Sequence, residues 1–512
     1  MIHKSWRAAV LIAGVALNAG AQQSATRPAI TQADLRRRLS IFADDSMLGR
    51  SALNPGHERA VRYLASELKR LGLKPMGENG TYFQTFYILE RRANRASTIQ
   101  VGDSTLRPGV DFKALAFGRG QPRPIQSAPI VFGGIVGDST TQISADSAAG
   151  KVVLLGVPAT MNANRAYANV IYGPRSRFAR ALAVAIASFD FLPPNQRGIT
   201  SQVGMADTSE EAANTHPITI LVSRRAADLM LASDVAMAKA GVQGQRMTSR
   251  ISVDETRHPV RNVIAVIPGA DPVLRNEYVA LGAHSDHLGT SVRPLEHDSV
   301  RAVAIERRRR LIGLSSGSGP ISANVDSLRR VRPPRVDSIF NGADDDGSGS
   351  VALLEIAERF ATAPLKPKRS LLFAWHAAEE MGLVGSTWLS EHPVIPLDSI
   401  VAQLNMDMIG RGNAGDVPNG GPTILGVIGA SVRSPALAKL VDDTNRTLAM
   451  PFQLVTRDQE NAFCRSDHWN YARFGIPVAF FTTGEHADYH QVTDEAQYVD
   501  YEKLERVTRF VA

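Results

Sequence analysis

Cysteine is almost absent from this chain of 512 residues, because Cys464 is the only one. A single thiol cannot form a disulfide within the chain, so stability has to come from a large core and from any metal that is bound. A strong excess of charge is missing as well, since 57 Lys and Arg residues oppose 50 Asp and Glu residues. The net charge of +7 therefore favours a solvated surface over a nucleic-acid site.

Long apolar runs are also missing, and none beyond the N-terminus approaches the roughly 20 residues that a membrane span requires. Residues 1–21 instead have the pattern of a secretory signal peptide. Lys4 and Arg7 supply its charge, residues 8–17 its apolar stretch and residues 19–21 (AGA) its small cleavage motif. The short apolar stretch argues against an uncleaved anchor, and the lack of Cys argues against a lipid anchor. We therefore expect a secreted or periplasmic protein.

The length and a change of pattern predict at least two domains, because a single core seldom grows beyond roughly 250 to 300 residues. Short strand-like runs separated by Gly, Pro, Ser and Asp fill the region before residue 250, together with an Ala-rich segment, 178–188, predicted to be helical. We expect a signal peptide at 1–21, the first part of a main domain at 22–96, a smaller inserted β-rich domain at 97–249 and the rest of the main domain at 250–512.

Apolar runs alternate with helical patterns in the second half, which predicts an α/β fold. Its central sheet should be mixed and mostly parallel, with helices on both faces. Four of the runs lead directly into acidic and imidazole side chains: Val279–Ala283 into His284, Leu371–Trp375 into residues 376–380, Ile400–Met406 into Asp407, and Pro477–Thr482 into residues 484–490. Ligands bind at the carboxyl ends of the strands in open α/β sheets, so these side chains should converge in one cleft.

Three consecutive carboxylates, Asp344, Asp345 and Asp346, lie within the glycine-rich stretch 341–350 (NGADDDGSGS). Adjacent acids repel one another, and glycine lets the backbone approach a bound ion closely, so the run predicts a cation site. A solvated turn or a weak calcium loop is the alternative, but the spacing of an EF-hand is absent. Spacing alone does not select which of the three binds metal.

Two divalent ions close together need one bridging carboxylate and further His, Asp or Glu ligands. The sequence offers His284 and Asp407 for one ion and Glu380 and His490 for the other, with a member of the Asp run between them. Ligands of this kind without thiolate favour zinc, although manganese or cobalt could bind the same set.

Two further acids have predicted roles in catalysis. Asp286 lies two residues after His284, so on an extended chain it could accept the second ring N–H of that ligand. Glu379 is adjacent to Glu380 and points elsewhere, which suits a general base that takes a proton from water and returns it to a leaving amine.

The remaining histidines are predicted to contribute less to the site. His287 and His468 lie in two of the sequence stretches described below, and they could support the ligands by hydrogen bonding. The other candidates, His376, His392 and His486, are expected to be ordinary loop or surface residues.

The sequence resembles the M28 family of zinc peptidases, the co-catalytic two-zinc aminopeptidases, from about Asp44 to its end. Six stretches match in the family's order: HSDH (284–287), GADDDGSG (342–349), AAEEMGLVGS (377–386), NMDMIG (405–410), SDHWNYARFGIPVAFF (466–481) and DYHQVTDE (488–495). The resemblance implies that Glu379 is the base and that two Zn²⁺ ions per chain are bound by His284, Asp345, Glu380, Asp407 and His490. It also implies that Asp345 is the bridge and that the Asp345–Asp346 peptide bond is cis.

Residues 97–249 resemble the protease-associated domain of many such enzymes, best at Gly150–Leu155, and that domain is expected to border the cleft. One departure concerns Phe463, where several family members have a Tyr that helps to stabilise the oxyanion; Tyr489 or Arg465 could replace it. The long Arg-rich insertion at 291–340 fits either a cationic flap that recognises acidic substrate groups or a solvated surface insertion, and we favour the second.

The expected function is an exported aminopeptidase that uses zinc-activated water on peptides with a free N-terminus, with no nucleic-acid or membrane partner. A glutaminyl-peptide cyclotransferase on the same fold is one alternative, but it uses a single zinc and does not need all five ligands. A non-catalytic receptor-like binding protein is another, but such proteins typically lose ligands or the base. The preferred N-terminal residue and the oligomeric state are not determined by the sequence.

Overall fold

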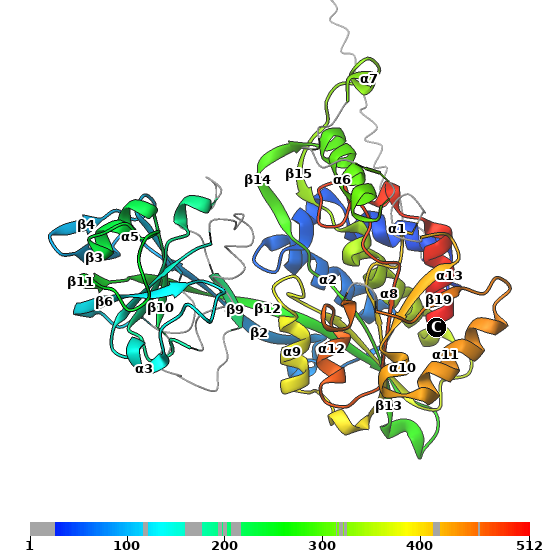
Figure 1. The fold of residues 1–512 in the computed structure, drawn as a ribbon. Helices are drawn as coiled ribbons and strands as arrows, with labels where there is room; N and C mark the ends of the chain where they lie inside the picture. Colours follow the sequence, from blue (N-terminus) through cyan, green and yellow to red (C-terminus); the bar gives the residue numbers. More distant parts are fainter. Residues whose placement is uncertain are drawn as a thin grey trace, which may run out of the picture.

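The structure is a computed structural model that describes residues 26–115, 121–158, 177–192, 197, 202–205, 217–313, 315–316, 321, 325–412, 420–458 and 461–512. The predicted signal peptide, 1–21, lies outside these residues. The described chain forms a large lobe, which holds both the first and the last helix, and a smaller lobe beside it (Figure 1). None of the helices that the structure describes is both long and apolar enough to cross a membrane.

The large lobe is organised around a ten-stranded mixed sheet. Its strands, in spatial order, are β19 (Gln453–Val455), β18 (Ile424–Ile428), β20 (Val478–Thr482), β17 (Ile400–Met406), β13 (Tyr278–His284), β16 (Ser370–His376), β12 (Val253–Ile267), β2 (Phe83–Ala93) and β9 (Gln202–Met205), with β1 (Lys74–Pro75) beside β12. The four central strands β20, β17, β13 and β16 are parallel to one another. Strand β12 pairs antiparallel with β16 on one side and with β2 on the other. The predicted mixed α/β fold is confirmed, and the predicted apolar runs form the four parallel strands.

Helices cover both faces of this sheet because its central strands are apolar on both sides. Along β16, Phe373 and Trp375 point into one core, whereas Leu372 and Ala374 point into the other. The first core is covered by α1 (Gln32–Phe42), α2 (Pro55–Arg70), α8 (Gly349–Thr362), α11 (Pro435–Thr447) and α13 (Tyr501–Val511). The second is covered by α9 (Val384–Glu391) and α12 (His468–Ala472). A short helix, α10 (Ala430–Arg433), precedes α11.

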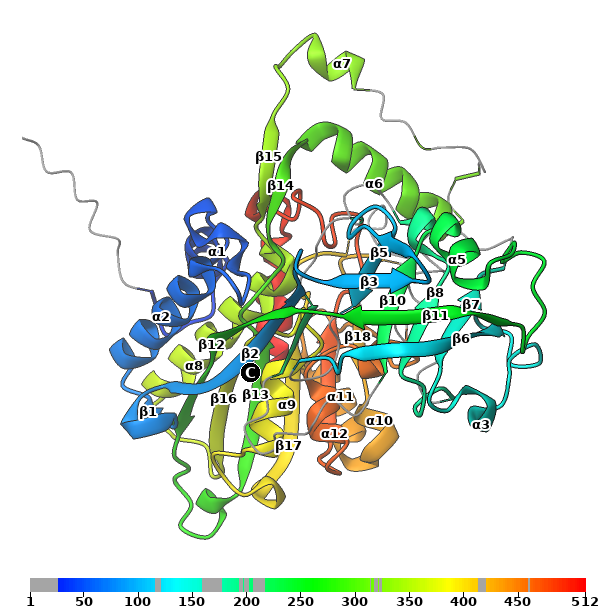
Figure 2. The ribbon, with the colours of Figure 1, turned by 90° about the vertical axis from the view of Figure 1, so that its left-hand side faces the viewer.

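The smaller lobe contains an eight-stranded sheet with a core on each face. Its spatial order is β4 (Ser104–Leu106), β3 (Thr98–Val101), β11 (Gln243–Arg250), β6 (Ile125–Ile135), β7 (Val152–Gly156), β8 (Ala183–Ile186), β10 (Ile218–Val222) and β5 (Phe112–Leu115). The described part of this lobe also contains α3 (Ala145–Ala148) and α5 (Arg224–Leu231). The long antiparallel pair β2–β12 joins the two lobes (Figures 1 and 2). A separate protease-associated-like domain at 97–249 stays a prediction, and β9, within that range, pairs with β2 in the main sheet.

The prediction of a helix at 178–188 is wrong, because β8 occupies the centre of that segment. All four residues of β8 are buried, and the strand lies between the parallel strands β7 and β10. Pairing on both edges and burial on both faces override the helical preference of alanine.

The Arg-rich insertion forms an arm on the large lobe, which we define as residues 289–340. Strands β14 (Gly289–Glu296) and β15 (Val336–Phe340) pair as an antiparallel ribbon, and α6 (His297–Leu311) and α7 (Asp326–Arg329) lie between them in sequence. Figure 2 shows the ribbon and α6 above the main sheet.

Candidate metal centre

The predicted ligands come together at one edge of the main sheet, where the parallel strands end. His284 is the last residue of β13, and Asp407 directly follows β17. Glu380 follows β16, and His490 follows β20 in a loop. Asp345 comes from a different place, the turn Ala343–Ser348 that leads into α8. Parallel pairing explains the convergence, because it puts the carboxyl ends of neighbouring strands at the same edge.

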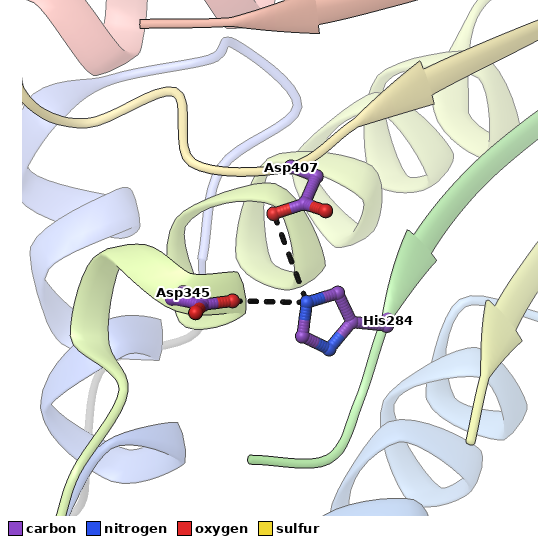
Figure 3. A group of neighbouring side chains, drawn as sticks. All are labelled: His284, Asp345 and Asp407. Carbon is purple, nitrogen blue, oxygen red and sulfur yellow. Dashed lines mark hydrogen bonds and ion pairs between the residues drawn. The ribbon is translucent and has the colours of Figure 1, made fainter. Parts of the chain in front are cut away.

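His284, Asp345 and Asp407 form the first group that could hold a metal ion. His284 Nε2 lies 3.0 Å from Asp345 Oδ1 and 3.7 Å from Asp407 Oδ1 (Figure 3). All three side chains are buried, and the histidine is 1% exposed. Two acids and one imidazole therefore face a common point inside the protein.

Asp345 also belongs to a second group, with His287 and Glu380. Its other oxygen, Oδ2, lies 3.2 Å from His490 Nε2, and His490 Nε2 is 3.0 Å from Glu380 Oε2. His287 Nδ1 lies 2.7 Å from Glu380 Oε1. Asp345 thus faces one group with each oxygen, and the structure brings all five predicted ligands together with His287 as a sixth neighbour.

Several buried polar atoms of this cluster have no hydrogen-bond partner in the described chain and could instead bind a metal ion. Among the described residues, Asp345 Oδ2, Glu380 Oε1 and both ring nitrogens of His287 are buried without a hydrogen bond of good geometry. Such atoms are costly unless a cation or another partner satisfies them. The donors are carboxylate oxygens and imidazole nitrogens without thiolate, a set that fits zinc.

The turn that carries Asp345 is held by contacts on its backbone. The Asp494 carboxylate accepts hydrogen bonds from the N–H groups of Asp344 and Asp345, each at 3.0 Å from Oδ2. Arg50, itself fully buried, donates to the carbonyl of Gly342 at 2.8 Å. Gly342 has φ +55°, and a Cβ there would lie 2.5 Å from the His287 ring, so the position requires glycine.

The other two acids of the run also have partners. Asp346 accepts from the N–H of His284 at 2.9 Å, and Asp344 Oδ1 accepts from the N–H of Gly410 at 2.6 Å. The Asp345–Asp346 peptide bond is cis, which confirms the expectation from the family resemblance. Asp344 and Asp346 therefore support the turn through backbone contacts, and Asp345 is the member that faces both ligand groups.

The hydrogen bond predicted from His284 to the Asp286 carboxylate is not made. His284 Nδ1 lies 3.7 Å from the Asp286 carboxylate and 3.2 Å from the backbone carbonyl of Asp286. The carboxylate instead accepts from the N–H of Glu379 at 3.0 Å. Strand β13 ends at His284, so the alternation of an extended chain does not continue to Asp286. Asp286 therefore holds the segment that carries the predicted base.

Asp407 is oriented by a partner that the sequence reasoning missed. Ser466 donates from Oγ to Asp407 Oδ2 at 2.7 Å, and Asn405 Nδ2 donates to the same Ser466 oxygen at 2.9 Å. Ser466 opens a predicted motif, but no local pattern shows which side chain its hydroxyl contacts.

Glu379 lies at the edge of this cluster, with its carboxylate 4.0 Å from His284 Nε2. Burial raises its pKa well above the ordinary value; His284 opposes the shift, and Asp407 and Glu380 add to it. A carboxyl group with a raised pKa can hold a proton between two steps of a reaction, as a general base must.

A pocket opens beside Asp345, Glu379 and His490. Its apolar walls include Met408, Ala462 and Phe480, and its polar rim includes Arg465, Glu485 and Tyr489. The apolar part could receive a substrate side chain next to the ligands.

Phe463 is absent from the lining of this pocket and packs edge-on against His468 and Trp469. Both proposed replacements for the missing Tyr line the pocket, and Arg465 Nη2 lies 3.4 Å from the Tyr489 hydroxyl. Burial and the charge of Asp345 raise the pKa of Tyr489, which keeps its phenol protonated and able to donate.

The prediction that His376 is an ordinary loop or surface residue is wrong, and His486 lies in a loop as predicted but is not at the surface. His376 is the last residue of β16, fully buried, with Nδ1 3.2 Å from Asp467 Oδ2. His486 is also buried, and its Nε2 lies 3.2 Å from Asp344 Oδ2. Both acids that pair with these histidines are distant in sequence, so no local pattern indicated the burial. His392, by contrast, is exposed and stacks on Trp388.

Comparisons with known proteins find a family match and several relatives. Residues 262–512 match the model of peptidase family M28. The chain is 34% identical over 165 residues to leupeptin-inactivating enzyme 1 of Streptomyces exfoliatus, covering 32% of this chain and 34% of that enzyme. It is 29% identical over 192 residues to leucine aminopeptidase 1 of Paracoccidioides brasiliensis (strain Pb18), covering 36% of this chain and 48% of that enzyme. The chain thus spans about a third to a half of the length of these curated relatives.

Among solved structures, the fold is similar to that of the aminopeptidase from Aneurinibacillus sp. strain AM-1. The TM-score is 0.51 at 17% identity, over 94% of this chain and 92% of that one. At this identity the likeness concerns the fold, and it extends over both lobes.

Proposed function

Because the chain belongs to peptidase family M28 over residues 262–512, we propose that it is an exported, zinc-dependent aminopeptidase that removes N-terminal residues from peptides. The similarity to leupeptin-inactivating enzyme 1 and to leucine aminopeptidase 1 supports this activity. Export rests on the signal-like pattern of residues 1–21. In this proposal each chain binds two Zn²⁺ ions.

The arrangement of Asp345 carries the proposal. One of its oxygens lies 3.0 Å from His284 and the other 3.2 Å from His490, so a single carboxylate faces two separate groups of ligands. We assign His284 and Asp407 to one ion, Glu380 and His490 to the other, and Asp345 to both. A structural site for one ion would not need a carboxylate shared in this way.

Bound zinc would supply Lewis acidity toward a peptide carbonyl and toward water. The chain's own residues do the rest: Glu379 takes the proton of the attacking water and returns it to the leaving amine. The Tyr489 phenol, protonated and at the pocket rim, donates to the oxygen on which charge develops. Met408, Ala462 and Phe480 receive the first side chain of the substrate.

The test combines a metal count with a pair of substrates. Zinc per chain is measured by mass spectrometry, and hydrolysis of leucyl-p-nitroanilide is compared with that of its N-acetylated form. We expect two zinc ions, turnover of the free amine only, loss of turnover after chelation and its return with added zinc.

Three other results would each contradict the proposal. Equal hydrolysis of the acetylated substrate would indicate that no free N-terminus is required. One zinc per chain together with pyroglutamate release from an N-terminal Gln peptide would indicate a cyclotransferase. Inactivity toward a panel of aminoacyl substrates after zinc loading would indicate a binding protein.

A further inference from the structure

The loop that carries His490 contains three acids that face the Arg-rich arm. We define the His490 limb as residues 484–495, which follow β20. Its acids Glu485, Asp488 and Glu495 each lie within ion-pair distance of a basic side chain from the arm. The arm, 289–340, is separated from the limb by more than a hundred residues in sequence, so this contact is made only by folding.

The central contact joins Arg301 on α6 to Asp488, two residues before His490. Arg301 Nε lies 3.2 Å from Asp488 Oδ1. Asp488 is fully buried and also accepts from Arg411 Nη2 at 3.0 Å and from the Thr493 hydroxyl at 2.7 Å. Three donors from different parts of the chain therefore converge on Asp488, and this acid anchors the limb.

Two outer contacts extend this attachment on either side of His490. Arg308, buried on the same helix, has Nη1 3.5 Å from Glu485 Oε2, and Glu485 also pairs with Arg465 at the pocket rim. At the other end of the limb, Arg335 and His297 lie 2.8 and 3.1 Å from the same oxygen of Glu495.

Three of these basic groups lie on one face of α6, and Arg335 precedes β15. His297, Arg301 and Arg308 are spaced by four and seven residues, which puts them on the same side of a helix. The buried residues of α6 include His297 and Arg308, whereas Arg307 is exposed. Since few apolar side chains of α6 are buried, the face that meets the limb is held mainly by charge.

His297, Asp337 and Glu495 also satisfy the geometry of a third metal group. The guanidinium of Arg335 already lies against the same Glu495 oxygen that His297 approaches, so a cation is present at that point. This group is better explained as the attachment of the arm to the limb.

His490 itself needs such support. It has φ +57°, in the left-handed region that non-glycine residues seldom adopt, and its side chain is a third exposed. A partly exposed ligand in a loop with unfavourable backbone geometry depends on neighbouring contacts to stay in position.

We propose that Arg301 and Arg308 are positioning residues of the metal centre: through Asp488 and Glu485 they hold the limb so that His490 reaches Asp345 and Glu380. The arginines of the arm thus act on the chain's own acids and not on substrate carboxylates. The inference rests on the proposed function in one respect, that His490 is a zinc ligand.

The test compares Arg301→Ala and Arg308→Ala with Arg307→Ala, a control of equal charge change on the exposed side of the same helix. Zinc content and affinity are measured by chelator competition, and hydrogen exchange of residues 484–495 is measured in the zinc-free protein. We expect Arg301→Ala to weaken one of the two ions by about 10- to 100-fold, to leave the other unchanged and to speed exchange in the limb. Arg308→Ala should have a smaller effect in the same direction, Arg301→Lys should restore part of the affinity, and the control should match the wild type.

Two zinc ions bound with wild-type affinity in both variants, or equal weakening of both ions, would overturn the inference. If Arg301→Ala does not fold, Arg308→Ala decides, because it leaves the Asp488 contacts intact; unchanged exchange and affinity in that variant would then refute it. A wild-type protein without two zinc ions would instead refute the proposed function, so the two failures are distinguishable.

Discussion

Helix α8 connects two buried clusters of carboxylates that differ in how their charge is balanced. At its N-terminal end the turn with Asp345 meets Glu380, Asp407 and their histidines. Farther along, Glu355 and Glu358 meet Arg38 of α1, whose guanidinium also reaches Glu67. Arg38 is 1% exposed and lies 2.6 Å from Glu355, 2.7 Å from Glu67 and 2.5 Å from Glu358.

The difference teaches that buried charge alone does not identify a functional site. In the Arg38 cluster a fixed cation of the chain contacts each acid, although Glu355 Oε2 has no hydrogen-bond partner among the described residues. In the metal centre the acids are crowded with histidines, and several of their atoms lack a partner of good geometry. The site whose acids face histidines and one another, and not a fixed cation as in the Arg38 cluster, is the one that could hold an ion from solution.

Among the substitutions that test this comparison, Asp345→Asn is expected to have the largest effect on zinc binding and activity. The change removes the charge that faces both ligand groups, so we expect no zinc to be retained through gel filtration and activity to fall to background. Metal analysis of the purified variant is the measurement. Asp111→Asn, a buried acid of the smaller lobe that pairs with Arg225, is the matched control and should retain both ions. Two zinc ions in Asp345→Asn would refute the bridging role.

Glu379→Gln should separate the chemistry from the metal binding. The amide keeps the size of the side chain but cannot accept the proton, so kcat should fall roughly 100- to 10,000-fold. Zinc content and the thermal unfolding curve should stay as in the wild type. Wild-type turnover with both metals present would rule out Glu379 as the base.

Arg38→Leu should damage stability and leave the metal centre intact. Removing the cation that contacts all three acids leaves buried Glu355 without its ion-pair partner, whereas Glu67 and Glu358 keep Arg70. Breaking such a buried pair costs about 3 to 5 kcal/mol. Urea unfolding measures the loss, and zinc per folded chain should not change. Arg62→Leu removes an exposed ion pair with Glu58 on α2 and should cost about 0 to 1 kcal/mol. Similar losses in the two variants would contradict the assigned importance of burial.

The smallest effect is expected from Ser466→Ala. The hydroxyl donates to Asp407 at 2.7 Å, so its loss should weaken zinc binding by about tenfold through a less well oriented ligand. Chelator competition gives the affinity, and Ser390→Ala, a buried serine of α9 whose hydroxyl donates to the carbonyl of Thr387 in the same helix, serves as the control. If the zinc affinity does not change, Ser466 contributes to packing and does not orient Asp407.

Local pattern in the sequence was enough for the central strands and for most of the candidate ligands, whereas the choice of Asp345 came from the family resemblance. Apolar runs followed at once by His284 and Asp407, and a short distance later by Glu380, specify where strands end, and parallel pairing brings such ends together. The same local rule misassigned 178–188, since an Ala-rich segment prefers a helix until neighbouring strands pair with it. It also failed at Asp286, where the strand ends earlier than the alternation assumes.

The amino-acid sequence by itself thus determined the mixed α/β fold, the family resemblance and the residues able to hold metal, because periodicity and motif spacing are local properties of the chain. Only the tertiary structure decided which charges are paired. Arg301 finds Asp488 across 187 positions, and Arg38 finds Glu355 across 317. Pairing over such separations depends on how the helices and loops pack, and no spacing along the chain encodes it.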